Sequence, residues 1–128
     1  MHDSFVVLIA DDEPVSRAIA KRYLTQSEYT VLVASNGREA LDLYTQHHPS
    51  IVITDWRMPD MNGIELCKAI RAESRDLYTY IIMLTGQIEK EHIVTGLEAG
   101  ADESCLKPDG IPARMLRCSL DKAQEKTR

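Results

Sequence analysis

Residues 5–13, Phe5-Val-Val-Leu-Ile-Ala10-Asp11-Asp12-Glu13, join an unbroken apolar run directly to three acidic side chains. The same pattern returns at Ile51-Val-Ile-Thr54, which Asp55 follows. Short apolar runs rich in β-branched residues are typical of strands buried on both faces of a parallel sheet. Because ligands of open α/β sheets bind beyond the carboxyl ends of the strands, Asp11, Asp12 and Asp55 are expected to share one pocket.

Apolar runs alternate with helical patterns along the whole chain. Further strands are predicted at about 29–33, 80–84 and 103–106, with a helix after each strand. The first helix is expected to carry Val15, Ala18, Ile19 and Arg22-Tyr23 at helical spacing. This alternation predicts a flavodoxin-like, doubly wound α/β fold with a five-stranded parallel sheet in the order 2-1-3-4-5 and five helices. That order places the first and third strands side by side.

Composition and charge limit the classes of protein that this chain can represent. The 128 residues, 44% hydrophobic and 27% charged, fit a single globular domain, with a core over about 5–120 and a helical tail or linker start over 121–128. A net charge of −5 is not the footprint of a nucleic-acid-binding surface, so we expect no nucleic acid partner for this domain.

Localisation is inferred from the cysteines and from the first apolar run. Cys67, Cys105 and Cys118 are odd in number and widely spaced, which favours reduced thiols in a cytoplasmic protein. The first apolar run is short and meets three acids at once, which argues against a signal peptide or a membrane span.

The acidic cluster, taken with two other strand ends, indicates phosphoryl chemistry. Three close carboxylates repel one another unless a hard cation such as Mg2+ joins them. Thr85 and Lys107 end the fourth and fifth predicted strands, where a hydroxyl and an ammonium could contact phosphoryl oxygens. Asp55 stands alone at its strand end and is the expected nucleophile, whereas the adjacent Asp11 and Asp12 suit direct and water-mediated cation binding.

The motifs together resemble the receiver domain of two-component response regulators over about Phe5 to Leu120. The residues that carry the resemblance are Asp11-Asp12, Asp55-Trp56-Arg57-Met58-Pro59, Asn62-Gly63, Met83-Leu-Thr-Gly86, Gly96-Leu-Glu-Ala-Gly-Ala101 and Lys107-Pro108. The resemblance implies a signalling domain rather than an enzyme. It implies phosphoryl transfer to Asp55 from a phosphohistidine of a sensor histidine kinase or phosphotransfer protein, and control of an output domain or protein. It leaves open a homodimer of the phosphorylated form.

The same resemblance implies roles for individual residues. Mg2+ would be held by Asp11 or Asp12, Asp55 and the backbone carbonyl of Arg57, while Thr85 and Lys107 would reach the phosphoryl oxygens. The side chains of Arg57 and Gln87 would border the path of the hydrolytic water and tune the lifetime of the phosphorylated form. The Lys107-Pro108 bond resembles the family's cis peptide.

Two positions depart from the family pattern. Ser104 stands three residues before Lys107, where the family usually has an aromatic switch residue, so the usual readout of phosphorylation is in question. Asp109-Gly110 follows Lys107-Pro108 in place of an apolar aromatic, which predicts a looser connection to the last helix.

Two other classes of protein compete with this interpretation. A Mg2+-dependent phosphohydrolase with an aspartate nucleophile would usually need an acid two residues after it, where Arg57 stands. An FMN-binding flavodoxin would need a phosphate-binding loop after the first strand, where Asp11-Asp12-Glu13 would repel phosphate. The helical, charged character persists to Arg128, which favours a receiver cut from a longer protein.

Overall fold

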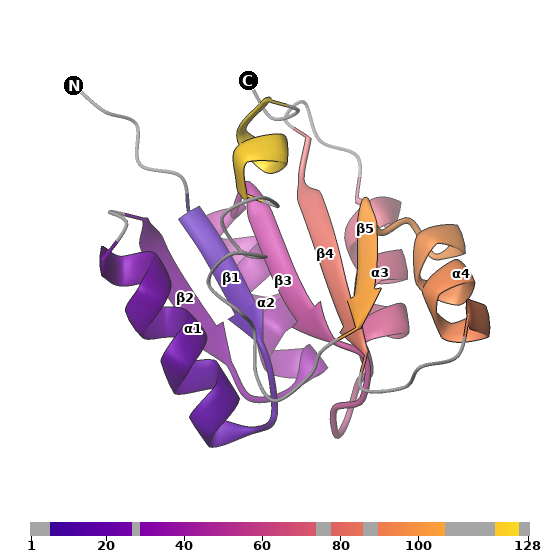
Figure 1. The fold of residues 1–128 in the computed structure, drawn as a ribbon, viewed down its shortest axis with the longest axis horizontal. Helices are drawn as coiled ribbons and strands as arrows, with labels where there is room; N and C mark the ends of the chain where they lie inside the picture. Colours follow the sequence, from indigo (N-terminus) through magenta and orange to yellow (C-terminus); the bar gives the residue numbers. More distant parts are fainter. Residues whose placement is uncertain (1–5, 27–28, 74–77, 86–89, 107–119, 126–128) are drawn as a thin grey trace.

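A computed structural model describes residues 6–26, 29–73, 78–85, 90–106 and 120–125. Five parallel strands form one sheet in the order β2-β1-β3-β4-β5, as predicted (Figure 1). The strands are β1 (Val6–Ala10), β2 (Thr30–Ala34), β3 (Ile51–Asp55), β4 (Tyr80–Thr85) and β5 (Glu103–Leu106). The predicted flavodoxin-like fold is therefore confirmed.

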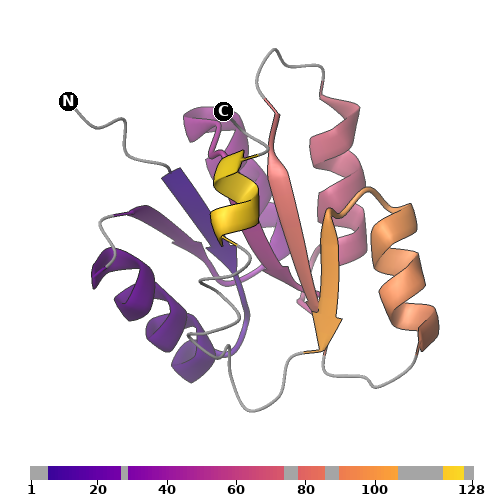
Figure 2. The same cartoon turned by 45° about the horizontal axis from the view of Figure 1, so that its top comes forward.

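Helices cover both faces of the sheet. They are α1 (Pro14–Gln26), α2 (Gly37–His47), α3 (Gly63–Ala72), α4 (Lys90–Glu98) and a helical segment at 120–125. Helix α1 and the segment at 120–125 lie on one face, and α2 and α3 lie on the other (Figures 1 and 2). Asn36 and Asn62 cap α2 and α3 by accepting hydrogen bonds from the backbone N–H groups of Glu39 and Glu65.

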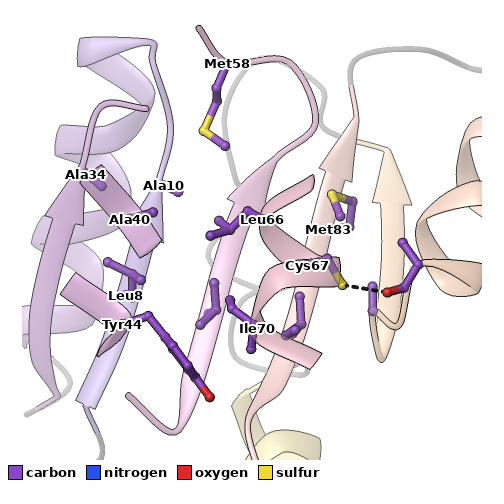
Figure 3. Packing of buried hydrophobic residues seen from close by; sticks show 14 residues of the cluster. Leu8, Ala10, Ala34, Ala40, Tyr44, Met58, Leu66, Cys67, Ile70 and Met83 are labelled. Atoms are coloured by element: carbon purple, nitrogen blue, oxygen red, sulfur yellow. Dashed lines mark hydrogen bonds between the residues drawn. The ribbon is translucent and has the colours of Figure 1, made fainter. Parts of the chain in front are cut away.

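Alternate residues of each central strand enter two separate cores. Leu8 and Val52 belong to the core beneath α2 and α3, whereas Val7, Ile9 and Ile53 belong to the core beneath α1 (Figure 3 shows the first of these). Since successive side chains of a strand point to opposite faces, a strand covered on both sides must be apolar throughout. This double burial explains the unbroken apolar runs of the sequence.

Helix α1 buries small side chains together with Leu24 and leaves two large apolar ones exposed. Val15 and Ile19 are 65% and 50% exposed, whereas Ser16, Ala20 and Leu24 are buried against the sheet. The physical reason is close packing, because the small side chains of Ser16 and Ala20 let the helix approach the sheet. Two large apolar side chains are left on the outer surface of α1.

Arg71 fastens the amino ends of β4 and β5 to the end of α3. Its guanidinium donates to the carbonyl oxygens of Thr79 and Gly100 at 2.7 and 2.8 Å, and to Oδ2 of Asp102 at 2.9 Å. Asp102 Oδ2 also accepts a hydrogen bond from the backbone N–H of Ile81 at 2.8 Å. This end of the sheet, opposite the strand ends that carry the acids, is therefore held by charged hydrogen bonds.

Cys67 is a buried thiol in α3 whose Sγ donates to the carbonyl oxygen of Ala99 at 3.4 Å (Figure 3). Burial raises the pKa of this thiol to about 11, so it stays protonated at neutral pH. The expectation that the cysteines are buried is met at this position. None of the helices in the part of the chain that the structure describes has the length and apolar character needed to span a lipid bilayer.

Candidate phosphoacceptor site

The register of β1 and β3 brings the acidic residues together. Ala10 pairs with Thr54, so the residues that follow them, Asp11 and Asp55, leave the sheet side by side. One carboxylate oxygen from each of Asp11, Asp12 and Asp55 lies within 4.8 Å of the others. Asp11 is buried, Asp55 is half-buried and Asp12 is exposed. The predicted convergence of three acids at the carboxyl edge of the sheet is thus present in the structure.

Asp11 is held firmly by the main chain around it. Its N–H donates to the carbonyl oxygen of Ala34 at 3.1 Å, which extends the pairing of β1 with β2 by one residue. Its Oδ1 accepts a hydrogen bond from the N–H of Glu13 at 2.9 Å, closing a turn into α1. Asp11 is only 2% exposed, so it forms the inner wall of the acidic cluster.

The segment after Asp55 is fixed by hydrogen bonds of Trp56. The N–H of Trp56 lies 3.0 Å from Oδ1 of Asp55 and 2.8 Å from the carbonyl oxygen of Leu84, while its own carbonyl accepts from the N–H of Gly63 at 2.8 Å. A Cβ placed on Gly63 would lie 2.3 Å from the carbonyl oxygen of Asp55. Only glycine therefore allows α3 to begin so close to the strand that carries Asp55.

A second glycine supports the same loop from the neighbouring helix. A Cβ placed on Gly37, the first residue of α2, would lie 2.0 Å from the carbonyl oxygen of Met61. Asp60, just before Met61, has a φ of 69°, a left-handed conformation that aspartate tolerates better than most residues. The loop between β3 and α3 is consequently packed tightly between α2 and the start of α3.

The three carboxylates fit a small hard cation. Mg2+ binds oxygen at about 2.1 Å in octahedral geometry, which puts its ligand oxygens roughly 3 to 4.2 Å apart. Oxygens that already lie within 4.8 Å of one another reach such positions with small side-chain rotations. Asp11, Asp12 and Asp55 are therefore the residues that could hold Mg2+, and the exposure of Asp12 leaves the cluster open to solvent and to a ligand.

The structure describes only some of the other predicted site residues. The backbone of Thr85 ends β4 one residue after Leu84, the partner of Asp55 in the sheet. Arg57 lies two residues after Asp55 with an exposed side chain. Lys107, Gln87, the Lys107-Pro108 bond and Asp109-Gly110 lie outside the described residues.

Sequence reasoning missed one residue that contacts the site. Nη1 of Arg17, in the second turn of α1, donates to the carbonyl oxygen of Asp11 at 2.8 Å. The sequence offered one signal for this contact: Arg17 stands four residues after Glu13, and therefore lies over the turn that begins the helix. Any residue type has a backbone carbonyl, so the identity of Asp11 does not show that an arginine binds it, and the spacing was not enough to predict the contact.

Comparison with known sequences assigns the chain to a family. The sequence profile of the response regulator receiver domain matches residues 7–115. A single five-stranded sheet of this order, covered by helices on both faces and carrying three acids at its carboxyl edge, agrees with this match. The chain belongs to the response regulator receiver domain family.

Individual relatives agree with this assignment. The chain is 41% identical over 104 residues to a chemotaxis protein CheY homolog of Campylobacter jejuni, covering 80% of each chain. It is 42% identical over 102 residues to the probable transcriptional regulator ycf27 of Porphyra purpurea, covering 80% of this chain but only 41% of that protein. The Francisella response regulator 1452 receiver domain superposes with a TM-score of 0.88 at 27% identity, covering 98% of this chain and 100% of that one.

Proposed function

We propose that this receiver domain accepts a phosphoryl group on Asp55 in a Mg2+-dependent reaction and passes the signal to an output domain or protein. The observation that carries the proposal is the cluster of Asp11, Asp12 and Asp55 at the carboxyl edge of β1 and β3. Asp55 is half-buried and ends a central strand, where it is both held in place and open to a phosphodonor. The proposed donor is a phosphohistidine of a sensor histidine kinase or phosphotransfer protein.

The proposed reaction is a single displacement at phosphorus. A carboxylate oxygen of Asp55 forms a bond with phosphorus while the bond from phosphorus to the imidazole nitrogen of the donor breaks. The imidazole nitrogen keeps the electron pair and takes up a proton. Mg2+, when bound, supplies positive charge that offsets the three carboxylates and the charge on the phosphoryl oxygens.

Further roles follow from the position of each residue in the family pattern. We assign Asp11, Asp12, Asp55 and the backbone carbonyl of Arg57 to the Mg2+ site, Thr85 and Lys107 to the phosphoryl oxygens, and Gln87 with the Arg57 side chain to control of hydrolysis. The rival phosphohydrolase function is disfavoured by Arg57, which presents an exposed cation two residues after Asp55 where a general acid would be needed.

Phosphorylation by a small donor tests the proposal. Incubation with a small acyl phosphate and Mg2+ is expected to add one phosphoryl group per chain, labile to acid and base, as an acyl phosphate should be. Asp55→Asn is expected to abolish labelling, and so is removal of Mg2+ by a chelator, because repulsion among the carboxylates and the donor is then unrelieved.

A nearby acid supplies the matched control. Asp60 lies in the loop after β3 and is exposed, so Asp60→Asn removes the same charge without altering the cluster and should label like the parent. Labelling of Asp55→Asn to the parent level would overturn the assignment of the phosphoacceptor.

A further inference from the structure

Arg17 ties the first turns of α1 to the backbone of the acidic cluster. Its Nη1 donates to the carbonyl oxygen of Asp11 at 2.8 Å, and its backbone N–H donates to the carbonyl oxygen of Glu13 at 2.9 Å. The side chain is half-buried, so this hydrogen bond is partly shielded from water. Both partners of Arg17 therefore belong to the turn Asp11–Glu13, which carries Asp11 and Asp12 of the acidic cluster.

The contact completes a set of restraints on Asp11. The N–H of Asp11 is held by Ala34 of β2, its Oδ1 by the N–H of Glu13, and its carbonyl oxygen by Arg17. The restraints come from β2, from the turn and from the second turn of α1, and so act in different directions. Since the peptide that joins Asp11 to Asp12 begins with that carbonyl, holding it also limits where the Asp12 side chain leaves the backbone.

We propose that Arg17 is a positioning residue for the cation site, acting through the backbone of Asp11 to keep the Asp11 and Asp12 carboxylates aimed at Asp55. The inference rests on the proposed function in that it takes Mg2+ as the ligand of the cluster. Mg2+ demands near-ideal octahedral geometry, so affinity depends on how well its ligands are oriented beforehand. Loss of a group that orients a metal ligand typically costs about 10- to 100-fold in affinity.

The charge of Arg17 and its proposed positioning role predict opposite effects of its removal on Mg2+ affinity. A guanidinium bonded to the backbone of the acidic cluster repels an incoming cation, so by charge alone its removal should tighten Mg2+ binding. If Arg17 instead orients the ligands, its removal should weaken binding although a repelling charge is lost. The sign of the change therefore separates the two explanations.

Titration with Mg2+, followed by tryptophan fluorescence, measures whether a variant binds the ion more tightly or more weakly, and it needs no phosphodonor. Trp56 is the only tryptophan of the chain, and its backbone N–H donates a hydrogen bond to the Asp55 carboxylate, so its emission should respond to the ion. Arg17→Met is expected to weaken Mg2+ binding by about tenfold, and Arg17→Lys by less, because the ammonium keeps the charge and a donor. Lys21→Met, one turn along α1, is the charge control and should bind at least as tightly as the parent.

Thermal unfolding in chelator separates positioning from plain stability. A merely structural Arg17 would lower the midpoint of unfolding without changing the Mg2+ affinity of the folded protein. Should Arg17→Met fail to give a folded circular dichroism spectrum, Arg17→Gln, which is also uncharged and two bonds shorter than arginine, takes its place in the titration.

The outcomes are distinguishable from a failure of the proposed function. Unchanged or tighter Mg2+ binding by the uncharged Arg17 variant, in a parent that binds Mg2+ and labels on Asp55, would overturn this inference alone. A parent that neither binds Mg2+ nor labels would remove the proposed function and the inference together.

Discussion

Ser104 of β5 carries a buried hydroxyl that makes no hydrogen bond with any residue that the structure describes. A Cβ placed on Gly96 of α4 would lie 2.7 Å from Oγ of Ser104 and 3.4 Å from Cγ of Met83. Helix α4 therefore packs directly on the Ser104 side chain. The hydroxyl is buried beneath a helix in place of the aromatic ring that the family pattern usually has here.

Replacing Ser104 by alanine is expected to stabilise the protein. A buried hydroxyl without a partner carries a desolvation cost of about 1–3 kcal/mol, so Ser104→Ala should raise the free energy of unfolding by about 1 kcal/mol in urea denaturation. Ser35→Ala is the matched control, because the exposed hydroxyl of Ser35 donates to Glu39 Oε1 at 3.1 Å and its loss should not stabilise. A loss of stability in Ser104→Ala as large as the predicted gain would contradict this explanation.

At the scale of elements, α1 presents an apolar strip next to the acidic cluster. Val15 and Ile19 are exposed on the helix that begins directly after Asp11, Asp12 and Glu13. Exposed apolar side chains beside a reactive group favour a surface that a partner covers. We therefore expect α1 to contact the protein that donates the phosphoryl group.

Ile19→Asp should slow phosphoryl transfer from a phosphorylated histidine phosphotransfer protein by about tenfold, because it places a charge in an apolar contact. Labelling from a small acyl phosphate should be unchanged, since that donor needs no protein contact. Leu97→Asp on α4 is the control, as Leu97 is 45% exposed, comparable to the 50% of Ile19, but lies on a different helix. Equal slowing by both variants would show that α1 is not the specific contact.

The strands and helices also show which features could be predicted from the sequence. Every predicted strand is present. The signal was clearest for β1, β3 and β4, because central strands buried on both faces require unbroken apolar runs. Helical spacing predicted α1 but not which of its side chains are buried, because Ser16 and Ala20 are buried for their small size, which hydrophobicity does not report. The meeting of Asp11 with Asp55 followed from strand order, whereas the hydrogen bond from Arg17 to a carbonyl depends on three-dimensional placement.

At the scale of the whole molecule, the two ends of the sheet are held differently. Arg71 fixes the amino ends of β4 and β5 through Thr79, Gly100 and Asp102. The carboxyl ends carry the acidic cluster, whose charges would change most in the proposed phosphorylation. Any rearrangement on phosphorylation should therefore concentrate at the carboxyl edge.

A beryllium fluoride mimic with Mg2+ should reveal this distribution in backbone NMR shifts. We expect the largest changes in the residues that follow Asp55 and Thr85 in the chain, and smaller ones along Glu103–Leu106, because Ser104 offers no ring to follow a movement of Thr85. Asp55→Asn with the same mimic should show none of these changes. Shifts along Glu103–Leu106 as large as those beside Asp55 would contradict the prediction.

Chemical trapping of the acceptor residue shows whether Asp55 carries the phosphoryl group. Borohydride reduces an aspartyl phosphate to homoserine, so peptide mass spectrometry after incubation with a phosphodonor and Mg2+ identifies the acceptor by position. We predict homoserine at Asp55 alone, and at no position when Mg2+ is chelated. Homoserine at Asp11, Asp12 or Asp60 in place of Asp55, or its absence from every aspartate of a protein that binds Mg2+, would contradict the account.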